Sequence, residues 1–203
     1  MTRRTRSSAR LPLLLGLSMT AAYVLFAVLA ASRFPRPYGP WYNNTLSQLG
    51  NSTLNPHGAI FYLTGCALTG VLAIFFFLHL SRWRQSGTQN QRRLLLIVQA
   101  LGAMSGLGLV MNAVFPENDY APHHFWAGLI FNAFAAAMLL APVALWRRDR
   151  SNLPIAGFCL LTFAAVILMF SFSATHWLEW LPVTMLLVFP PFIAFVLRSR
   201  AET

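Results

Sequence analysis

Six long runs of apolar residues, separated by shorter polar segments, make up most of the chain. Each run is long enough for a helix to cross the apolar core of a bilayer, which takes about 17–25 residues. We therefore expect an all-α polytopic membrane protein, a bundle of six transmembrane helices that forms a single transmembrane domain over residues 1–203. The spans are predicted at about residues 11–31, 58–80, 94–115, 122–146, 153–174 and 181–197, with an outer loop at 32–57.

The first apolar run has a competing interpretation as a cleaved signal peptide, because Leu29-Ala-Ala-Ser32 resembles a cleavage site. The run is longer than the roughly 7–15 apolar residues of a signal peptide. We therefore favour a helix that is retained in the mature protein.

Composition supports the membrane assignment. Apolar residues make up 57% of the chain and charged residues only 10%, against about 45–50% and 25% in soluble domains. No Asp, Glu or Arg lies near the middle of a run, which argues against an ion-coupled pump. Cys66 and Cys159 both lie inside apolar runs, so we interpret them as packing residues and infer no disulfide.

Arginine residues set the predicted orientation. All fifteen basic residues are Arg, and all but Arg33 and Arg36 flank the runs on the predicted side of the two termini. An excess of basic residues marks the cytoplasmic side of membrane proteins, so both termini are expected in the cytoplasm and the chain in the cell (inner) membrane. The net charge of +10 then indicates membrane lipids as partners and not nucleic acid.

Small residues within two of the runs predict close contact between helices. Gly65, Thr69 and Gly70 give the second run a small-residue surface. Gly102 and Gly106 form a small-xxx-small pair in the third run. We expect both sets of residues to have a packing role and assign them no catalytic role.

Polar side chains collect at the predicted outer ends of the spans, above all in the stretch 112–132. In this stretch an acidic turn is followed by two adjacent histidines. In a membrane protein, ionisable residues that take part in chemistry are expected in such a turn. The candidate catalytic residues are Ser47, Glu117, Asp119, His123 and His124. The candidate pocket residues are His57, Asn112, Gly128, Asn132, His176 and Glu179.

His124 is the residue on which the sequence argument places most weight. Its spacing from Gly128 and Asn132 puts the three residues on one face of the fourth helix, and Gly128 would leave room there for a polar pocket. His123 is expected to point elsewhere. If the 124/128/132 face met lipid instead of the bundle interior, the enzyme hypothesis would fail.

Three interpretations of these residues remain open. Polar loops and interfacial histidines are common, so structural or headgroup-contact roles are the plainest interpretation. Acid–base catalysis would use His124 oriented by Glu117 or Asp119, and Ser47 is the outer-loop serine to consider as a nucleophile. A divalent metal is a candidate cofactor with His123, His124 and Asp119 as ligands, although two adjacent histidines are a weak metal signal. Asp119 is also expected to cap the fourth helix.

Two short segments resemble a known family. They are Leu46-Ser47-Gln48-Leu49-Gly50 and Phe115-Pro116-Glu117-Asn118-Asp119, the second leading to His123-His124. They are similar to segments of small six-helix membrane proteins of bacteria and archaea, a domain of unknown function that is distantly similar to DRAM- and Sfk-type proteins. The resemblance implies a six-helix bundle, and it places Ser47, Asp119 and one of the two histidines at the family's polar positions. Some distant relatives act in lipid-anchor remodelling, which by analogy favours a lipid.

The sequence thus predicts an integral membrane protein with an outward-facing polar pocket that binds or processes a lipid or amphiphile. The alternative is a non-catalytic membrane subunit or sensor whose outer loop contacts a partner protein. A membrane-protein partner and a homo-oligomer are both compatible with the sequence. Whether the chain is an enzyme is left open at this point.

Overall fold

A computed structural model describes residues 3–80, 88–146, 153–172 and 176–202. Within these residues the chain is all-helical, and six helices are long and apolar enough to cross a membrane. The prediction of a six-helix membrane protein is confirmed. The helices are α1 Arg3–Ala31, α2 Ala59–His79, α3 Gln89–Val114, α4 Tyr120–Ala144, α5 Leu153–Ser171 and α6 Trp180–Glu202, with short 3-10 helices η1 Pro40–Tyr42, η2 Ser47–Gly50 and η5 His176–Glu179.

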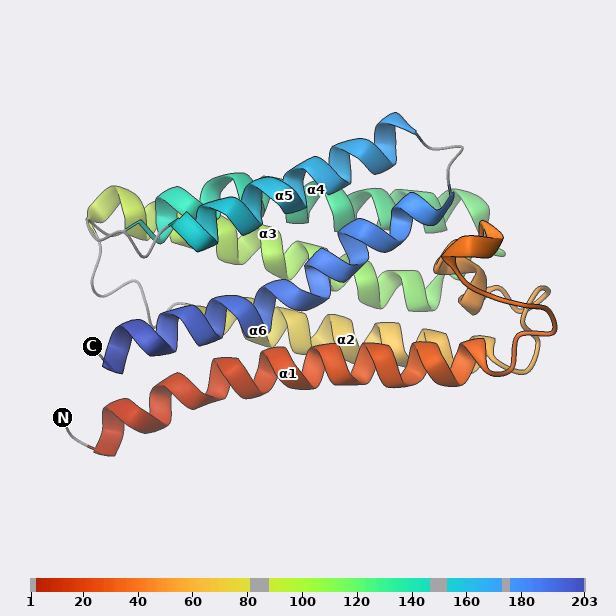
Figure 1. Ribbon diagram of the computed structural model, residues 1–203, viewed down its shortest axis with the longest axis horizontal. Helices are drawn as coiled ribbons and strands as arrows, with labels where there is room; N and C mark the ends of the chain where they lie inside the picture. The colour runs from red at the N-terminus through yellow and green to blue at the C-terminus, as the bar shows by residue number, and fades with distance from the viewer. Residues whose placement is uncertain (1–2, 81–87, 147–152, 173–175, 203) are drawn as a thin grey trace.

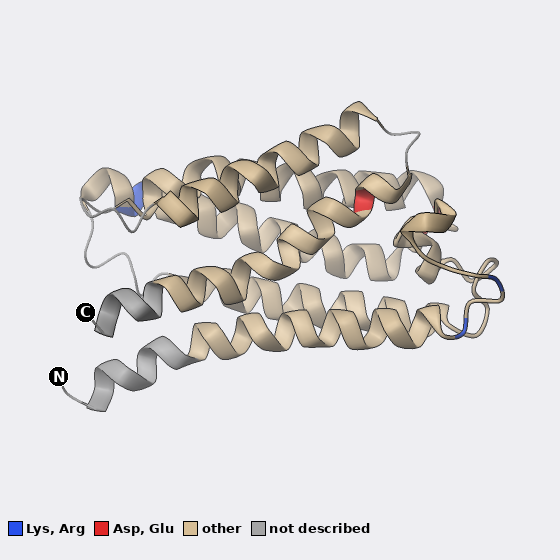
Figure 2. Cartoon of the chain, in the orientation of Figure 1, with Lys and Arg blue, Asp and Glu red and all other residues tan. Residues whose placement is uncertain are grey.

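The six helices run back and forth along the long axis of the molecule (Figure 1). Each of them packs against its neighbours in the chain, and α6 closes the bundle by packing against α1. The first turns of α1 and the last turns of α6 lie at one end, and the connection between α1 and α2 lies at the other. Figure 2 draws charged residues near the ends of the described helices and none in their middle.

Aromatic and aliphatic side chains fill the centre of the bundle. Phe76, Phe134 and Phe189 are fully buried, with Met138 and Ile193 beside them in the core. The ring of Phe189 lies 5.9 Å from that of Phe134 and 6.2 Å from that of Phe77. Close packing of this kind holds α2, α4 and α6 in register. It thereby fixes, relative to one another, the ends of these helices that lie opposite the chain termini.

Glycines make the contact between α2 and α3 close, as the sequence predicts. A Cβ on Gly70 would lie 2.5 Å from the carbonyl oxygen of Gly106, and a Cβ on Gly102 would overlap the ring of Phe77. Gly65 faces α1 instead, because a Cβ there would meet Phe26. The predicted small-residue surface of α2 therefore packs against two different helices, α3 at Gly70 and α1 at Gly65.

Two helix starts differ from the expectation. α3 begins at Gln89 because Thr88 and Gln91 form a capping box, with the Thr88 hydroxyl accepting from Gln91 N and the Gln91 side chain accepting from Thr88 N. α4 begins at Tyr120, and Asp119 occupies the N-cap position without a side-chain hydrogen bond to the helix. The prediction that the Asp119 carboxylate caps α4 is therefore wrong.

Candidate functional site

The loop between α1 and α2 folds back over the end of the bundle and carries Ser47. Leu46 and Leu49, on either side of Ser47, are buried in the core. Asn55 is 0% exposed, and its Nδ2 donates to the carbonyl oxygens of Leu49 and Ala30 at 2.9 and 3.2 Å. Since these bonds tie the loop to the end of α1, Ser47 has a fixed place over the helices.

Hydrogen bonds also tie this loop to the turn between α3 and α4. Asn51 Nδ2 donates to Glu117 Oε2 at 3.0 Å. Asn118 accepts from Ser52 N at 2.8 Å and donates to Asn51 Oδ1 and Thr53 Oγ1 at 3.1 and 3.0 Å. We call these residues (Asn51, Ser52, Thr53, Glu117 and Asn118) the loop clasp. The clasp brings Ser47 over the first turn of α4.

A second set of bonds joins the loop to the start of α6. Trp180 Nε1 donates to the carbonyl oxygen of Asn44 at 2.9 Å, and the Tyr38 hydroxyl donates to that of Thr45 at 2.6 Å. Burial raises the pKa of Tyr38 well above its ordinary value, and nearby Glu179 and Glu117 raise it further. Tyr38 therefore remains a hydrogen-bond donor across the physiological pH range.

His123 lies beneath Ser47 and is only 6% exposed. Its Nε2 is 3.1 Å from Ser47 Oγ, and its Nδ1 is 3.0 Å from the carbonyl oxygen of Phe115. A carbonyl oxygen can only accept, so Nδ1 carries a proton. In a neutral imidazole Nε2 is then an acceptor aimed at the Ser47 hydroxyl, which is the arrangement a general base requires.

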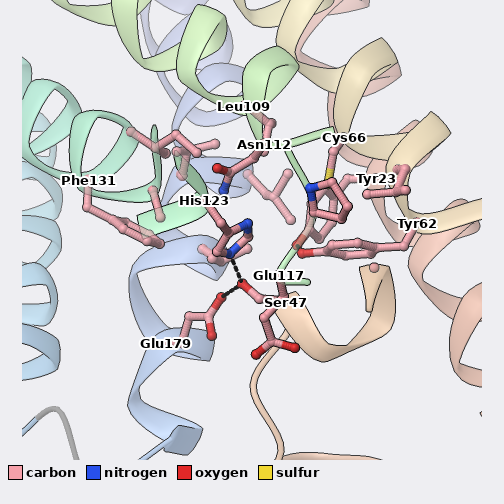
Figure 3. Close-up of a pocket in the computed structure, with 18 residues that line it drawn as sticks. Tyr23, Ser47, Tyr62, Cys66, Leu109, Asn112, Glu117, His123, Phe131 and Glu179 are labelled. Atoms are coloured by element: carbon pink, nitrogen blue, oxygen red, sulfur yellow. Dashed lines mark hydrogen bonds between the residues drawn. The ribbon is translucent and has the colours of Figure 1, made fainter. Parts of the chain in front are cut away.

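Glu179, at the end of η5, completes a chain of three side chains (Figure 3). Its Oε1 lies 3.1 Å from Ser47 Oγ, within hydrogen-bond distance. The serine has one proton and two acceptors, so the bonds can be satisfied in two ways. Ser47 donates to a neutral His123 while a protonated Glu179 donates to Ser47, or Ser47 donates to a Glu179 carboxylate while a doubly protonated His123 donates to Ser47. Both arrangements have no net charge.

Two cavities meet at this chain of side chains. The inner one has a volume of about 40 Å³ and reaches down between the helices to Tyr23, Tyr62 and Asn112. The outer one is an open cleft of about 290 Å³ between α4, α5 and η5. Ser47, Glu117, His123, Phe131 and Glu179 line both cavities. The inner cavity has room for a few water molecules, which need about 10–15 Å³ each, whereas the cleft approaches the size of a ligand pocket.

The model of the family described as Protein of unknown function (DUF998) matches residues 18–197. The chain belongs to this family. The match reaches from within α1 to within α6 and so includes part or all of each of the six helices. These helices are long and apolar enough to cross a membrane, so the protein is a membrane protein of an uncharacterised family. No curated protein and no solved structure matches the chain significantly, so the likeness to DRAM- and Sfk-type proteins stays a prediction.

The structure reverses the predicted orientations of the two adjacent histidines. His123 points into the bundle, whereas His124 is exposed and its Nδ1–H donates to the carbonyl oxygen of Tyr120 in its own helix at 2.9 Å. Asn132 is exposed as well and donates to Gly128 O. The helix begins at Tyr120, and its rotation places residue 123 on the inner face. The prediction that His123 points elsewhere is therefore wrong. His124 and Gly128 still line the outer cleft, but with His124 and Asn132 exposed this face does not turn into the bundle interior. The enzyme hypothesis in the form that rested on the 124/128/132 face therefore fails, and any catalytic role has to rest on His123 instead.

The other predicted site residues divide into two groups. Glu117 and His176 line the outer cleft, and Asn112 lines the inner cavity. Asp119 and His57 are exposed and line neither cavity. No three His, Cys, Asp or Glu residues come close enough to hold a metal ion among the residues that the structure describes. The predicted ligand set of His123, His124 and Asp119 is therefore not assembled.

Sequence reasoning missed the floor of the inner cavity. The hydroxyls of Tyr23 and Tyr62 lie 2.9 Å apart, and Cys66 lines the cavity beside them. Both tyrosines place a hydroxyl group within an apolar span, and a buried hydroxyl needs a hydrogen-bond partner. This requirement could have predicted that the two side chains lie in a polar part of the bundle. The sequence could not predict that the carbonyl group of Phe115 accepts a hydrogen bond from His123, because this contact depends on the backbone conformation of the turn between α3 and α4.

Proposed function

We propose that the protein is a membrane enzyme that cleaves or transfers the acyl group of an amphiphile, with Ser47 as nucleophile and His123 as general base. The observation that carries the proposal is the 3.1 Å contact between Ser47 Oγ and His123 Nε2, combined with the 3.0 Å contact between Nδ1 and Phe115 O. The second contact fixes the tautomer that can remove the serine proton.

The chemistry follows from this geometry. Nε2 of His123 takes the proton of Ser47 while Oγ forms a bond to the acyl carbonyl carbon of the substrate. The bond from that carbon to the leaving oxygen or nitrogen then breaks, and His123 returns the proton to the leaving group. A water molecule, or a second alcohol or amine, attacks the acyl-serine in the same way and regenerates Ser47. Glu179 steadies Ser47 before the reaction through its bond to Oγ.

The lining of the cleft supports an amphiphilic substrate. The lining contains polar groups such as Thr45 and His176, which we take as the rim, and the apolar side chains of Phe131, Met169 and Phe170, which we take as the wall for an acyl chain. The rings of Phe131 and Phe170 pack edge to face, 6.4 Å apart. A headgroup would meet the polar rim while an acyl chain lies against the aromatic wall, as the hydrophobic effect favours.

The charge pattern supports an outer-leaflet location for the reaction. We propose that both termini lie in the cytoplasm and that the end of the bundle carrying Ser47 faces outward from the cell membrane. The support is the excess of Arg flanking the spans on the side of the termini, together with the position of the loop clasp at the opposite end from the termini.

A fluorophosphonate with a long alkyl chain tests the proposal. An activated serine displaces fluoride and forms a stable bond to phosphorus, and peptide mass spectrometry locates the adduct. We expect one adduct, on Ser47, in the purified protein, and none on the Ser47→Ala variant. Ser52→Ala is the matched control, because Ser52 lies on the same loop and is exposed. A protein that is folded and takes up no probe at Ser47 would contradict the proposal.

One observation favours the alternative of a subunit or sensor. Trp41 and Tyr42 in η1 are 87% and 58% exposed, and exposed aromatic residues are typical of both interfaces and membrane-surface anchors. If this surface holds a membrane-protein partner, Trp41→Ala will release that partner in a crosslinking experiment in membranes. Labelling of Ser47 should not change in this variant.

A further inference from the structure

One carboxyl group in the lining of the outer cleft, that of Glu117, lies outside the hydrogen-bonded chain of Ser47, His123 and Glu179. Ser47, His123 and Glu179 carry no net charge together, in either of their two proton arrangements. Glu117 is then the remaining carboxyl group in the lining of the cleft. Asn51 Nδ2 donates to its Oε2 at 3.0 Å and so holds the carboxylate in place, which leaves its other oxygen to accept from a ligand. Figure 3 draws the Glu117 carboxyl group beside Ser47.

No Arg or Lys offsets this charge within the described lining of the cleft, whose basic side chains besides His123 are the imidazoles of His124 and His176. The chain contains no Lys, and the two Arg residues of this loop, Arg33 and Arg36, are exposed. Figure 2 shows basic residues of this end on the loop that follows α1, apart from the acidic residue drawn just before α6, where η5 ends. Sites that bind phosphate or carboxylate groups usually present Arg, Lys or a set of backbone N–H groups. The cleft presents none of these side chains.

We infer that the cleft selects an acyl amphiphile with a cationic ammonium headgroup and rejects one with a phosphate headgroup. The inference rests on the proposed acyl-transfer function, since it names the substrate class of the same site. An acyl carbonyl at Ser47 places the headgroup toward the rim, beside the Glu117 carboxylate. A positive charge is attracted there, whereas a phosphate would meet a like charge without an Arg or Lys to pair with.

A pair of esters of equal shape tests the inference. Myristoylcholine carries a quaternary nitrogen, and 3,3-dimethylbutyl myristate carries a carbon atom in its place. Binding is measured with the Ser47→Ala variant in lipid nanodiscs, so that turnover does not consume the ligand. Empty nanodiscs correct for partition into lipid. We expect the choline ester to bind roughly tenfold more tightly, as one carboxylate–ammonium contact at a partly exposed site allows.

A second variant tests whether the Glu117 carboxylate causes the preference for the choline ester. With Glu117→Gln added, the ratio of the two dissociation constants should fall toward one. Asp119→Asn is the control, since Asp119 lies two residues away but is exposed and does not line the cleft, and it should keep the ratio of the parent. Equal binding of the two esters, tighter binding of the neutral one, or tighter binding of monomyristoyl phosphatidic acid would overturn the inference.

Wild-type turnover separates this inference from the proposed function. Release of choline by the wild-type protein, absent in Ser47→Ala, supports both proposals. Preferential binding of the choline ester with no turnover and no labelling of Ser47 would sink the enzyme proposal while the headgroup preference stands. Turnover of both esters with equal kcat/KM would support the enzyme proposal and contradict the headgroup preference.

Discussion

Replacing Gly70 by Ala probes the contact between α2 and α3 that holds the site in place. The added Cβ would lie 2.5 Å from the carbonyl oxygen of Gly106 and 2.9 Å from Val110 N. Ordinary contacts of a Cβ begin at 3.4 Å, so the two helices must separate by about 0.9 Å. Both neighbouring atoms belong to the backbone, and a rotamer change cannot relieve the clash.

The size of the effect follows from two opposing terms. Overpacking of a close contact costs about 1–3 kcal/mol, and Ala is better than Gly in a helix by about 1 kcal/mol. Gly157→Ala supplies the second term alone, because no atom lies within 4 Å of a Cβ built there. The difference between the two variants therefore isolates the overpacking cost, and we expect Gly70→Ala to be less stable than Gly157→Ala by about 1–3 kcal/mol.

Unfolding of both variants in mixed micelles of dodecyl maltoside and increasing dodecyl sulfate measures this difference. Tryptophan fluorescence or near-UV circular dichroism follows the loss of tertiary structure. Equal stability of the two variants, or a more stable Gly70→Ala, would refute the close α2–α3 contact. Labelling of Ser47 by the fluorophosphonate should also slow in Gly70→Ala, since α3 leads into the turn that carries Phe115 and Glu117.

Three further predictions concern the loop, the inner cavity and the orientation. Asn118→Ala removes the four hydrogen bonds of this side chain to Asn51, Ser52 and Thr53, so limited proteolysis should cut the loop faster than in Asn132→Ala, which loses a bond to its own helix. Equal rates would contradict the loop clasp. Asn112 Oδ1 is buried without a hydrogen-bond partner, so Asn112→Leu should raise the free energy of unfolding by roughly 1 kcal/mol, and a loss of stability would mean that the amide has a partner in solution. In a protein without Cys66 and Cys159, a membrane-impermeant maleimide added to intact cells should label Ser52→Cys and should label Asn90→Cys only after permeabilisation; the opposite pattern would reverse the proposed orientation.

The helices could be predicted from the sequence because the lipid phase imposes a simple rule. Every backbone polar group in the bilayer core needs an internal partner, so a long apolar run has to be a helix. The first span was predicted at 11–31, where the structure has the apolar part of α1. The start of α3 was missed, although Thr88 and Gln91 have the spacing of a capping box. The glycine contacts were predictable because small residues in a span usually serve close packing.

The site was harder to predict, and the two histidines show why. Adjacent residues on a helix point about 100° apart, so a shift of the helix start decides which one faces inward. The sequence argument favoured His124 for its spacing from Gly128 and Asn132, but the i, i+4 pattern does not say which face meets the bundle. Ser47 and Glu179 were both named as candidates. Their meeting with His123 depends on how the loop folds over the helices, which the local sequence does not encode.

The rate of Ser47 labelling in two neighbouring histidine variants tests the central claim most directly. General-base catalysis contributes about 10²–10⁴ in rate, so His123→Ala should slow the reaction of Ser47 with the fluorophosphonate by about that factor. His124→Ala removes an equal side chain one residue away that bonds only to its own helix, and it should react at nearly the wild-type rate. Equal rates in the two variants, or a slower reaction in His124→Ala, would contradict the assignment of His123 as the base of Ser47.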